Sequence, residues 1–154
     1  MGTNIRQRND GGVGLVTDAT SEEIASFGGP FRGVKVYKAA LAGVAATTGG
    51  ALFALANPEG APIIITRFQI DVTTKSTGAA NVTFGTAANG TTSSDNLIDT
   101  YAIGGTEKVV DNLVDKGTNG KMNQKMTASQ YITGTGSATT AGLVGNVYIH
   151  YVLA

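Results

Sequence analysis

The middle of the chain alternates between apolar and polar positions, as a half-buried β-strand does. Over residues 63–74, one face would hold Ile64, Thr66, Phe68, Ile70 and Val72. The opposite face would hold Arg67, Gln69 and Asp71. A second strand is expected at 81–87, with Val82 and Phe84 facing inward, and the turn-forming sequence KSTGAA separates the two. This pattern predicts a β-hairpin over residues 63–87.

The end of the chain alternates equally well. In residues 141–154, one face would hold Leu143, Val147, Ile149, Tyr151 and Leu153, and the other Asn146, Tyr148 and His150. Shorter apolar segments at 34–43, 51–57 and 131–133 are separated by Gly, Pro and Thr. About eight short strands with turns between them are typical of an all-β fold, either an antiparallel β-sandwich or a barrel.

The first thirty residues differ from the rest because they are polar and rich in glycine. Before residue 18 there are few apolar residues, and the main group of them is Val13, Leu15 and Val16. One short helix is expected from Asp18, because Thr20 and Glu23 have capping-box spacing, and FGGP at 27–30 would end it. We therefore expect an N-terminal arm at 1–30, with this helix, and a β-sandwich domain at 31–154.

Composition narrows the function further. The chain has 154 residues, 42% of them hydrophobic and only 14% charged, against about 25% charged in ordinary soluble domains. Its net charge is zero, which argues against a nucleic-acid partner and favours association between molecules. It has no cysteine, no signal-peptide pattern and no apolar run long enough to span a membrane. We expect synthesis in a cytoplasm and no membrane partner.

Two nearly identical motifs raise the question of a metal site. Asp95–Asp99 has the sequence DNLID and Asp111–Asp115 has the sequence DNLVD. Four carboxylates could bind calcium, but neither copy has the central glycine and closing glutamate of an EF-hand loop. Asp and Asn are also common turn formers. The interpretation favoured here is therefore structural, with Asp95, Asp99, Asp111 and Asp115 in turns that lead into apolar anchors.

No catalytic or cofactor-binding constellation is recognisable. His150 is the one histidine, and it has no cysteine and no matching serine motif to act with. DKGTNGKM at 115–122 lacks the glycine spacing and the Ser or Thr of a phosphate loop. Tyr37, Tyr101 and Tyr148 could stack on a sugar, although packing is the commoner use of tyrosine. We predict no enzyme activity, no cofactor, and no catalytic, cofactor-binding or metal residues.

Two long stretches carry a resemblance to a known class of protein. They run from residue 65 to 105 and from 109 to 154, and include DVTTKSTGAA, TSSDNLID, DKGTNGK and GLVGNVYIHY. In their overall residue character and their order along the chain, these segments resemble the auxiliary head proteins of tailed bacteriophages, known as decoration, cement or head-fibre proteins. The resemblance covers about the last two-thirds of the chain.

The resemblance implies a jelly-roll-like β-sandwich that forms homotrimers on the capsid exterior of the virion. Such a protein would bridge major capsid protein subunits and stabilise the shell. By the same analogy, residues 1–30 would contact the shell, and strands near 34–56 and 141–154 would contribute to the trimer interface.

Two other hypotheses remain open. One is a head-fibre or tail-tip domain that binds a receptor or a glycan through the same β-fold. The other is a small β-sandwich enzyme in which His150 and some of Asp95, Asp99, Asp111 and Asp115 surround a metal.

Overall fold

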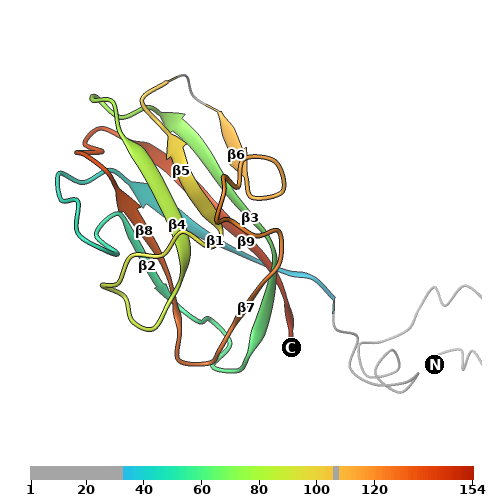
Figure 1. Cartoon of the computed structure of the whole chain (residues 1–154). Helices are drawn as coiled ribbons and strands as arrows, with labels where there is room; N and C mark the ends of the chain where they lie inside the picture. Colours follow the sequence, from blue (N-terminus) through green and yellow to red (C-terminus); the bar gives the residue numbers. More distant parts are fainter. Residues whose placement is uncertain (1–32, 106–107) are drawn as a thin grey trace, which may run out of the picture. The chain divides into compact units, whose positions relative to one another are not determined.

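The computed structural model describes residues 33–105 and 108–154, which fold into two antiparallel β-sheets (Figure 1). No helix occurs in this part of the chain, so the all-β prediction is confirmed there. None of the described residues belongs to a helix that could span a membrane. The predicted arm at 1–30, with its short helix, lies outside the described residues.

One sheet has five strands, and its order is β1-β9-β3-β6, with β7 also paired to β3. Its strands are β1 (Lys35–Ala42), β3 (Ile63–Thr74), β6 (Val109–Asp111), β7 (Gln124–Met126) and β9 (Val144–Leu153). The other sheet has four strands in the order β2-β8-β4-β5. Its strands are β2 (Phe53–Ala56), β4 (Asn81–Ala87), β5 (Ile98–Ala102) and β8 (Tyr131–Gly136).

The chain crosses repeatedly between the sheets, so strands that are neighbours in sequence are seldom neighbours in space. The predicted hairpin over 63–87 is therefore wrong. β3 pairs with β9, β6 and β7, whereas β4 pairs with β8 and β5 in the other sheet. Alternation identified both strands correctly, but it says nothing about which strand lies beside which. The connection 75–80 is long enough to pass from one sheet to the other.

Three phenylalanines join the sheets at the centre of the core. Phe68 of β3 lies 5.2 Å, between ring centroids, from Phe84 of β4, and Phe84 lies 6.2 Å from Phe53 of β2. Gly134 of β8 is the residue opposite both Phe53 and Phe84 in the four-stranded sheet. A Cβ atom at Gly134 would lie 2.5 Å from the Phe84 ring. The absent side chain is what allows the two rings to share this space.

β3 contains a bulge that changes which side chains face the core. Its pairing with β9 shifts between Ile65 and Arg67. Before the shift, Ile63 and Ile65 are fully buried while Ile64 is only partly buried, so the predicted face is wrong there. After it, Phe68, Ile70 and Val72 are buried as expected. One extra residue reverses the alternation.

β9 follows its predicted pattern. Val147, Ile149 and Tyr151 are buried, whereas Tyr148 and His150 are only partly buried on the opposite face. β9 lies between β1 and β3, so its buried face forms the middle of the five-stranded sheet's contribution to the core.

Candidate interaction surfaces

The outer face of the five-stranded sheet, which points away from the four-stranded sheet, gathers side chains from four strands. The register places Val36 of β1 opposite His150 of β9. It also aligns Lys38, Tyr148 and Gln69 in a row across β1, β9 and β3. These residues are far apart in sequence, and it is the sheet order that brings them together.

A shallow, open pocket of about 280 Å³ lies on this outer face. Its lining residues are Val36, Gln69, Asp71, Val109, Tyr148 and His150. The His150 Nε2 atom lies 3.2 Å from the Gln69 Oε1 atom, and the Lys38 Nζ atom lies 5.5 Å from the centre of the Tyr148 ring. Val36 and Val109 are each 55% exposed. The pocket thus combines amide, imidazole, phenol and carboxylate groups with exposed valines.

The structure does not bring the three candidate sugar-stacking tyrosines together. Tyr148 lies on the outer face, whereas Tyr37 lies on the opposite side of β1, because neighbouring strand residues point to opposite faces. Tyr101 belongs to the four-stranded sheet and is covered by Lys108, whose Nζ atom lies 4.8 Å from the ring centre. Of the three, Tyr148 is the one that lines the pocket on the outer face.

The asparagines of the two DNL(I/V)D motifs attach the motifs to strands. The Asn96 Oδ1 atom accepts a hydrogen bond of 2.8 Å from the backbone N–H of Thr86 in β4. The Asn112 Oδ1 atom accepts one of 2.7 Å from the backbone N–H of Phe68 in β3. Asn112 is fully buried, and its amide group also donates to the carbonyls of Lys121 and Met122. Each motif therefore fixes a loop to one of the two sheets.

The aspartates of the motifs act as local hydrogen-bond acceptors. Asp95 and Asp99 both accept from Asn119, through its side chain and its backbone N–H respectively. Asp111 forms an ion pair with Arg67 and accepts a hydrogen bond of 2.8 Å from the backbone N–H of Leu113. Across the described residues, no group of three His, Cys, Asp or Glu side chains could hold a metal ion. These contacts agree with the structural interpretation of the motifs.

The apolar side chains of the two motifs differ in their exposure to solvent. Leu97 and Ile98 of the first copy are fully buried. Leu113 and Val114 of the second copy are 41% and 82% exposed. The second copy therefore presents apolar surface on the loop between β6 and β7, and this difference could not be seen in two nearly identical stretches of sequence.

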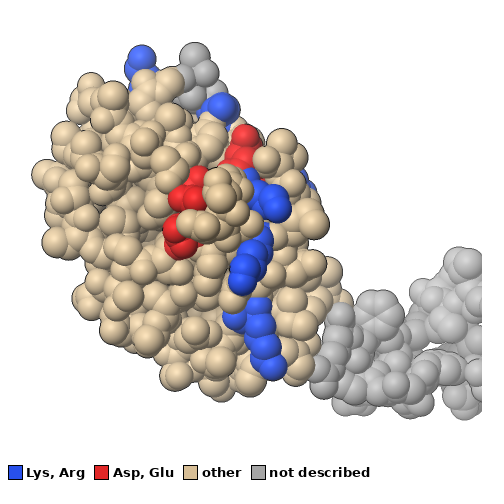
Figure 2. Space-filling view, viewed as in Figure 1, with Lys and Arg blue, Asp and Glu red and all other residues tan. Residues whose placement is uncertain are grey.

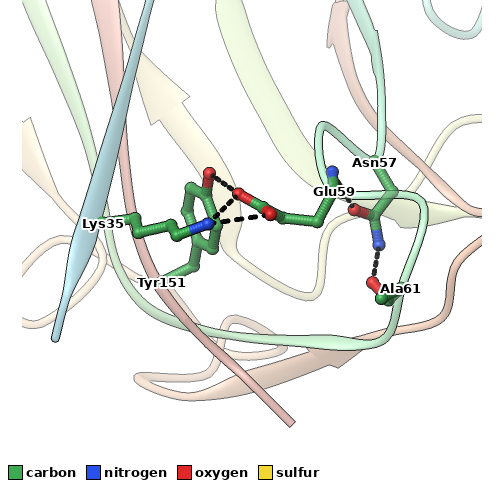
Figure 3. Close-up of polar contacts among 5 residues, drawn as sticks. All are labelled: Lys35, Asn57, Glu59, Ala61 and Tyr151. Atoms are coloured by element: carbon green, nitrogen blue, oxygen red, sulfur yellow. Dashed lines mark hydrogen bonds and ion pairs between the residues drawn. The ribbon is translucent and has the colours of Figure 1, made fainter. Parts of the chain in front are cut away.

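A polar cluster joins the start of β1 to the turn between β2 and β3 (Figure 3). The Lys35 Nζ atom lies 2.9 Å from both carboxylate oxygens of Glu59, and the Tyr151 hydroxyl donates to the Glu59 Oε1 atom at 2.6 Å. The Asn57 side chain holds the turn by accepting from the Glu59 backbone N–H and donating to the Ala61 carbonyl.

The contacts in this cluster shift the pKa values of Glu59 and Tyr151. The Tyr151 hydroxyl, and then Lys35, lower the pKa of Glu59 below 4.5. Burial, followed by the hydrogen bond to Glu59, raises the pKa of Tyr151 to about 12. Sequence reasoning placed Tyr151 on the apolar face and missed this role, because Glu59 lies 92 residues away and no local pattern links the two.

Figure 2 shows the charged side chains on one face of the molecule. Basic side chains form a narrow row beside a small group of acidic ones, and most of the remaining surface in this view is uncharged. Such a surface has little electrostatic repulsion to overcome when it packs against another protein.

No protein-family model matches the chain, and no curated protein matches it significantly. Two solved structures do match. A chain in the capsid of Ralstonia phage GP4 aligns with a TM-score of 0.53 and 16% identity, covering 79% of this chain and 85% of that one. A chain in the acid-stable capsid of Helicobacter pylori bacteriophage KHP30 aligns with a TM-score of 0.52 and 13% identity, covering 78% and 87%. The predicted resemblance to auxiliary head proteins of tailed bacteriophages is confirmed at the level of the fold, which this chain shares with chains of two phage capsids, and the decoration role stays a prediction.

Proposed function

We propose that this protein is a structural component of a tailed-bacteriophage virion that decorates the capsid exterior and stabilises it. In this role it bridges major capsid protein subunits as a homotrimer and carries out no catalysis. The observation that carries the proposal is the fold shared with chains of two bacteriophage capsid structures over more than three-quarters of this chain.

The order of the strands supports the more specific jelly-roll description. A jelly roll is a double sheet of eight strands built from two Greek keys. With the short β7 set aside, the remaining eight strands form two sheets with the orders β1-β9-β3-β6 and β2-β8-β4-β5. Strands from the beginning and the end of the chain lie side by side, as the closing of a rolled double sheet requires.

The surface supports a role in adhesion. Large apolar side chains are exposed at several places in the described residues, namely Val34, Val36, Val109, Leu113, Val114, Met122 and Val144. A protein that acts as cement gains its effect by adding several modest contacts on one particle, because after the first contact the others become effectively intramolecular. Apolar burial contributes about 25 cal/mol per Å² to such contacts.

The proposal is tested on virus particles that lack the protein. Purified full-length protein should bind these particles to saturation at sites between major capsid protein subunits, and image reconstruction would locate it. The reconstituted particles should withstand higher temperature before releasing DNA than the bare particles do. Failure to bind the shell, or binding only at the tail, would contradict the proposal.

The pocket on the outer face favours a second candidate function, a head-fibre or tail-tip domain that binds a glycan. Tyr148 could stack on a sugar ring while Asp71 and Gln69 bond its hydroxyls, although Lys38 would first have to leave the ring. A glycan array with the purified protein tests this, with Tyr148→Ala as the variant that should lose the signal. An array without specific binding would reject it.

A further inference from the structure

β1 is an edge strand whose outer side is unpaired. It pairs with β9 residue for residue from Lys35 to Ala42 without a bulge, and within residues 33–105 and 108–154 no strand lies on its other side. An unpaired edge presents a row of backbone N–H and C=O groups that can accept another strand. This row is eight residues long.

The other sheet edges are less able to accept a strand. β6 and β7 have three residues each, and β2 has four. β5 is interrupted by a register shift against β4, and its Thr100 has a φ of 58°, outside the extended range. Short and irregular edges are common protections against unwanted pairing. β1 has neither protection.

The lysines of β1 do not protect it either. Lysine on an edge strand normally keeps other strands away by its charge. Here Lys35 is bound by Glu59, and Lys38 lies over the ring of Tyr148 in β9. Both ammonium groups are thus directed toward the protein's own surface. The apolar side chains of the same region remain available, with Val34 59%, Val36 55% and Tyr37 37% exposed.

We propose that β1 pairs antiparallel with β1 of a second copy of this chain, across a two-fold axis. The two five-stranded sheets would then join into one continuous sheet. A second copy fits for two reasons. A strand pairing with itself about a two-fold axis is self-complementary, and the ion pair of Lys35 with Glu59 and the zero net charge reduce repulsion between two copies.

This contact goes beyond the proposed function and does not depend on it. A two-fold contact cannot by itself generate a trimer, so it leaves the three-fold contact to other surfaces and would connect neighbouring trimers. A single strand pair is smaller than a standard interface, which buries about 1,600 Å² in total. Association in solution should therefore be weak and concentration-dependent, and it should strengthen on a particle where many copies are held together.

The first test measures association of the purified full-length protein by sedimentation over a concentration series. The wild-type mass should rise with concentration to at least twice that of its smallest unit, and further if that unit is a trimer, which carries three β1 edges. Val36→Lys adds an unpaired positive charge to the exposed edge of each copy and should raise the dissociation constant roughly tenfold or more. Val114→Lys is the matched control, because it adds the same charge at an exposed valine far along the chain, and it should associate like the wild type.

The second test detects the geometry directly and does not rely on a destabilising change. The chain has no cysteine, so single substitutions Val36→Cys, Lys38→Cys and Ala40→Cys each provide one thiol. Under mild oxidation, the variant whose cysteine lies nearest the two-fold axis should give the highest yield of disulfide-linked dimer. The yield should be lower for the other two β1 variants. Val114→Cys should form little dimer.

Wild-type protein that shows no doubling at any concentration, or β1 cysteines that cross-link no better than the control, would overturn the proposal. Both tests use the protein without capsids. A failure to bind capsids would therefore count against the proposed function alone, and a failure to pair through β1 would count against this inference alone.

Discussion

Some single residues in this protein have a structural role that their residue type alone does not indicate. Gly134 is needed for the space it leaves, since Phe53 and Phe84 flank it on adjacent strands. Tyr151 lies on an apolar face, yet its hydroxyl completes a bond to Glu59 at the edge of the core. In both cases the role comes from a partner contributed by a distant part of the chain.

Gly134→Ala should destabilise the fold although alanine is small. Its Cβ atom would lie 2.5 Å from the Phe84 ring and 3.0 Å from the Phe53 Cβ atom, so the rings must move. Overpacking of this kind costs about 1–3 kcal/mol, and urea denaturation should show a lower midpoint with little change in slope. Gly105→Ala is the matched control, because its Cβ atom would meet no neighbouring atom within 4 Å and its φ lies outside the left-handed region, so it should cost little. Equal losses in the two variants would contradict the packing argument.

Low pH should weaken the contribution of Glu59 to the stability of the fold. Its pKa in the folded protein is lowered below 4.5, so the folded state favours the ionised form, and this stabilisation is present above pH 4.5. It is lost as the pH falls through the lowered value. The gap in unfolding free energy between wild type and Glu59→Gln should therefore narrow toward low pH in a series of urea titrations. A gap that is constant with pH would rule out this role.

At high pH, deprotonation of Tyr151 should lower the stability of the fold. Its pKa is raised from 10.0 to about 12 in the folded protein, so the folded state favours the protonated form. The stabilisation is complete below pH 10 and falls as the pH rises toward 12. Tyr151→Phe should remove this part of the decline in thermal stability, whereas Tyr148→Phe on the outer face should retain it.

At the scale of elements, the two nearly identical motifs place their apolar side chains in different environments. The first DNL(I/V)D motif sends its apolar pair into the core at the start of β5, and the second leaves Leu113 and Val114 on the surface after β6. What the copies share is the asparagine that accepts a hydrogen bond from a strand N–H, of β4 in one case and β3 in the other. The motif is therefore a way of attaching a loop to a sheet.

Matched substitutions in the two motifs should separate these roles. Leu97→Ala removes a fully buried side chain and should cost about 2–5 kcal/mol. Leu113→Ala changes a side chain that is 41% exposed and should cost less than about 1 kcal/mol. Chemical denaturation of both variants measures the difference. Similar losses at the two positions would mean that the exposed copy also packs.

The elements were predictable to the extent that their patterns are local. Residues 68–72 and the inward face of β9 follow the predicted alternation closely, and the strands appear where turn residues separate apolar segments. Two features were not predictable. The bulge before Arg67 reverses the faces of β3 without any Gly or Pro to mark it, and the pairing of β3 with β9 rather than β4 depends on contacts across the whole chain.

The interaction surfaces were predictable only in part, for the same reason. Tyr148 and His150 were expected on one face of the last strand, and they do lie together in the pocket. The partners Val36 and Gln69 reach them only because β1 and β3 flank β9. The exposed edge of β1 could not be inferred either, since a strand's position in a sheet is a property of the topology.

At the scale of the whole molecule, the crossing of the chain between sheets should make folding cooperative. Neither sheet can be completed without strands from both ends of the described residues, and Phe68 and Phe84 join the sheets in one core. We expect a single unfolding transition, with the same midpoint by far-ultraviolet circular dichroism and by tyrosine fluorescence. Folding should be slow for the chain length, because most strand pairs are distant in sequence.

Leu97→Ala provides the check on cooperativity. It should shift both midpoints by the same amount, although Leu97 is attached to the four-stranded sheet through its backbone bond to Phe84. Two separate transitions, or a shift seen by one probe alone, would show that the sheets unfold independently.

The pairing of Lys35 with Tyr151 has a practical consequence for engineering. Because β1 begins where β9 ends, a payload fused after Ala154 would leave the molecule beside the first residues of β1 and could obstruct that edge. The connection between β3 and β4, at residues 75–80, lies at the opposite end of the sheets. A peptide intended for display would be better inserted there, where it would be held away from the Lys35 end of β1.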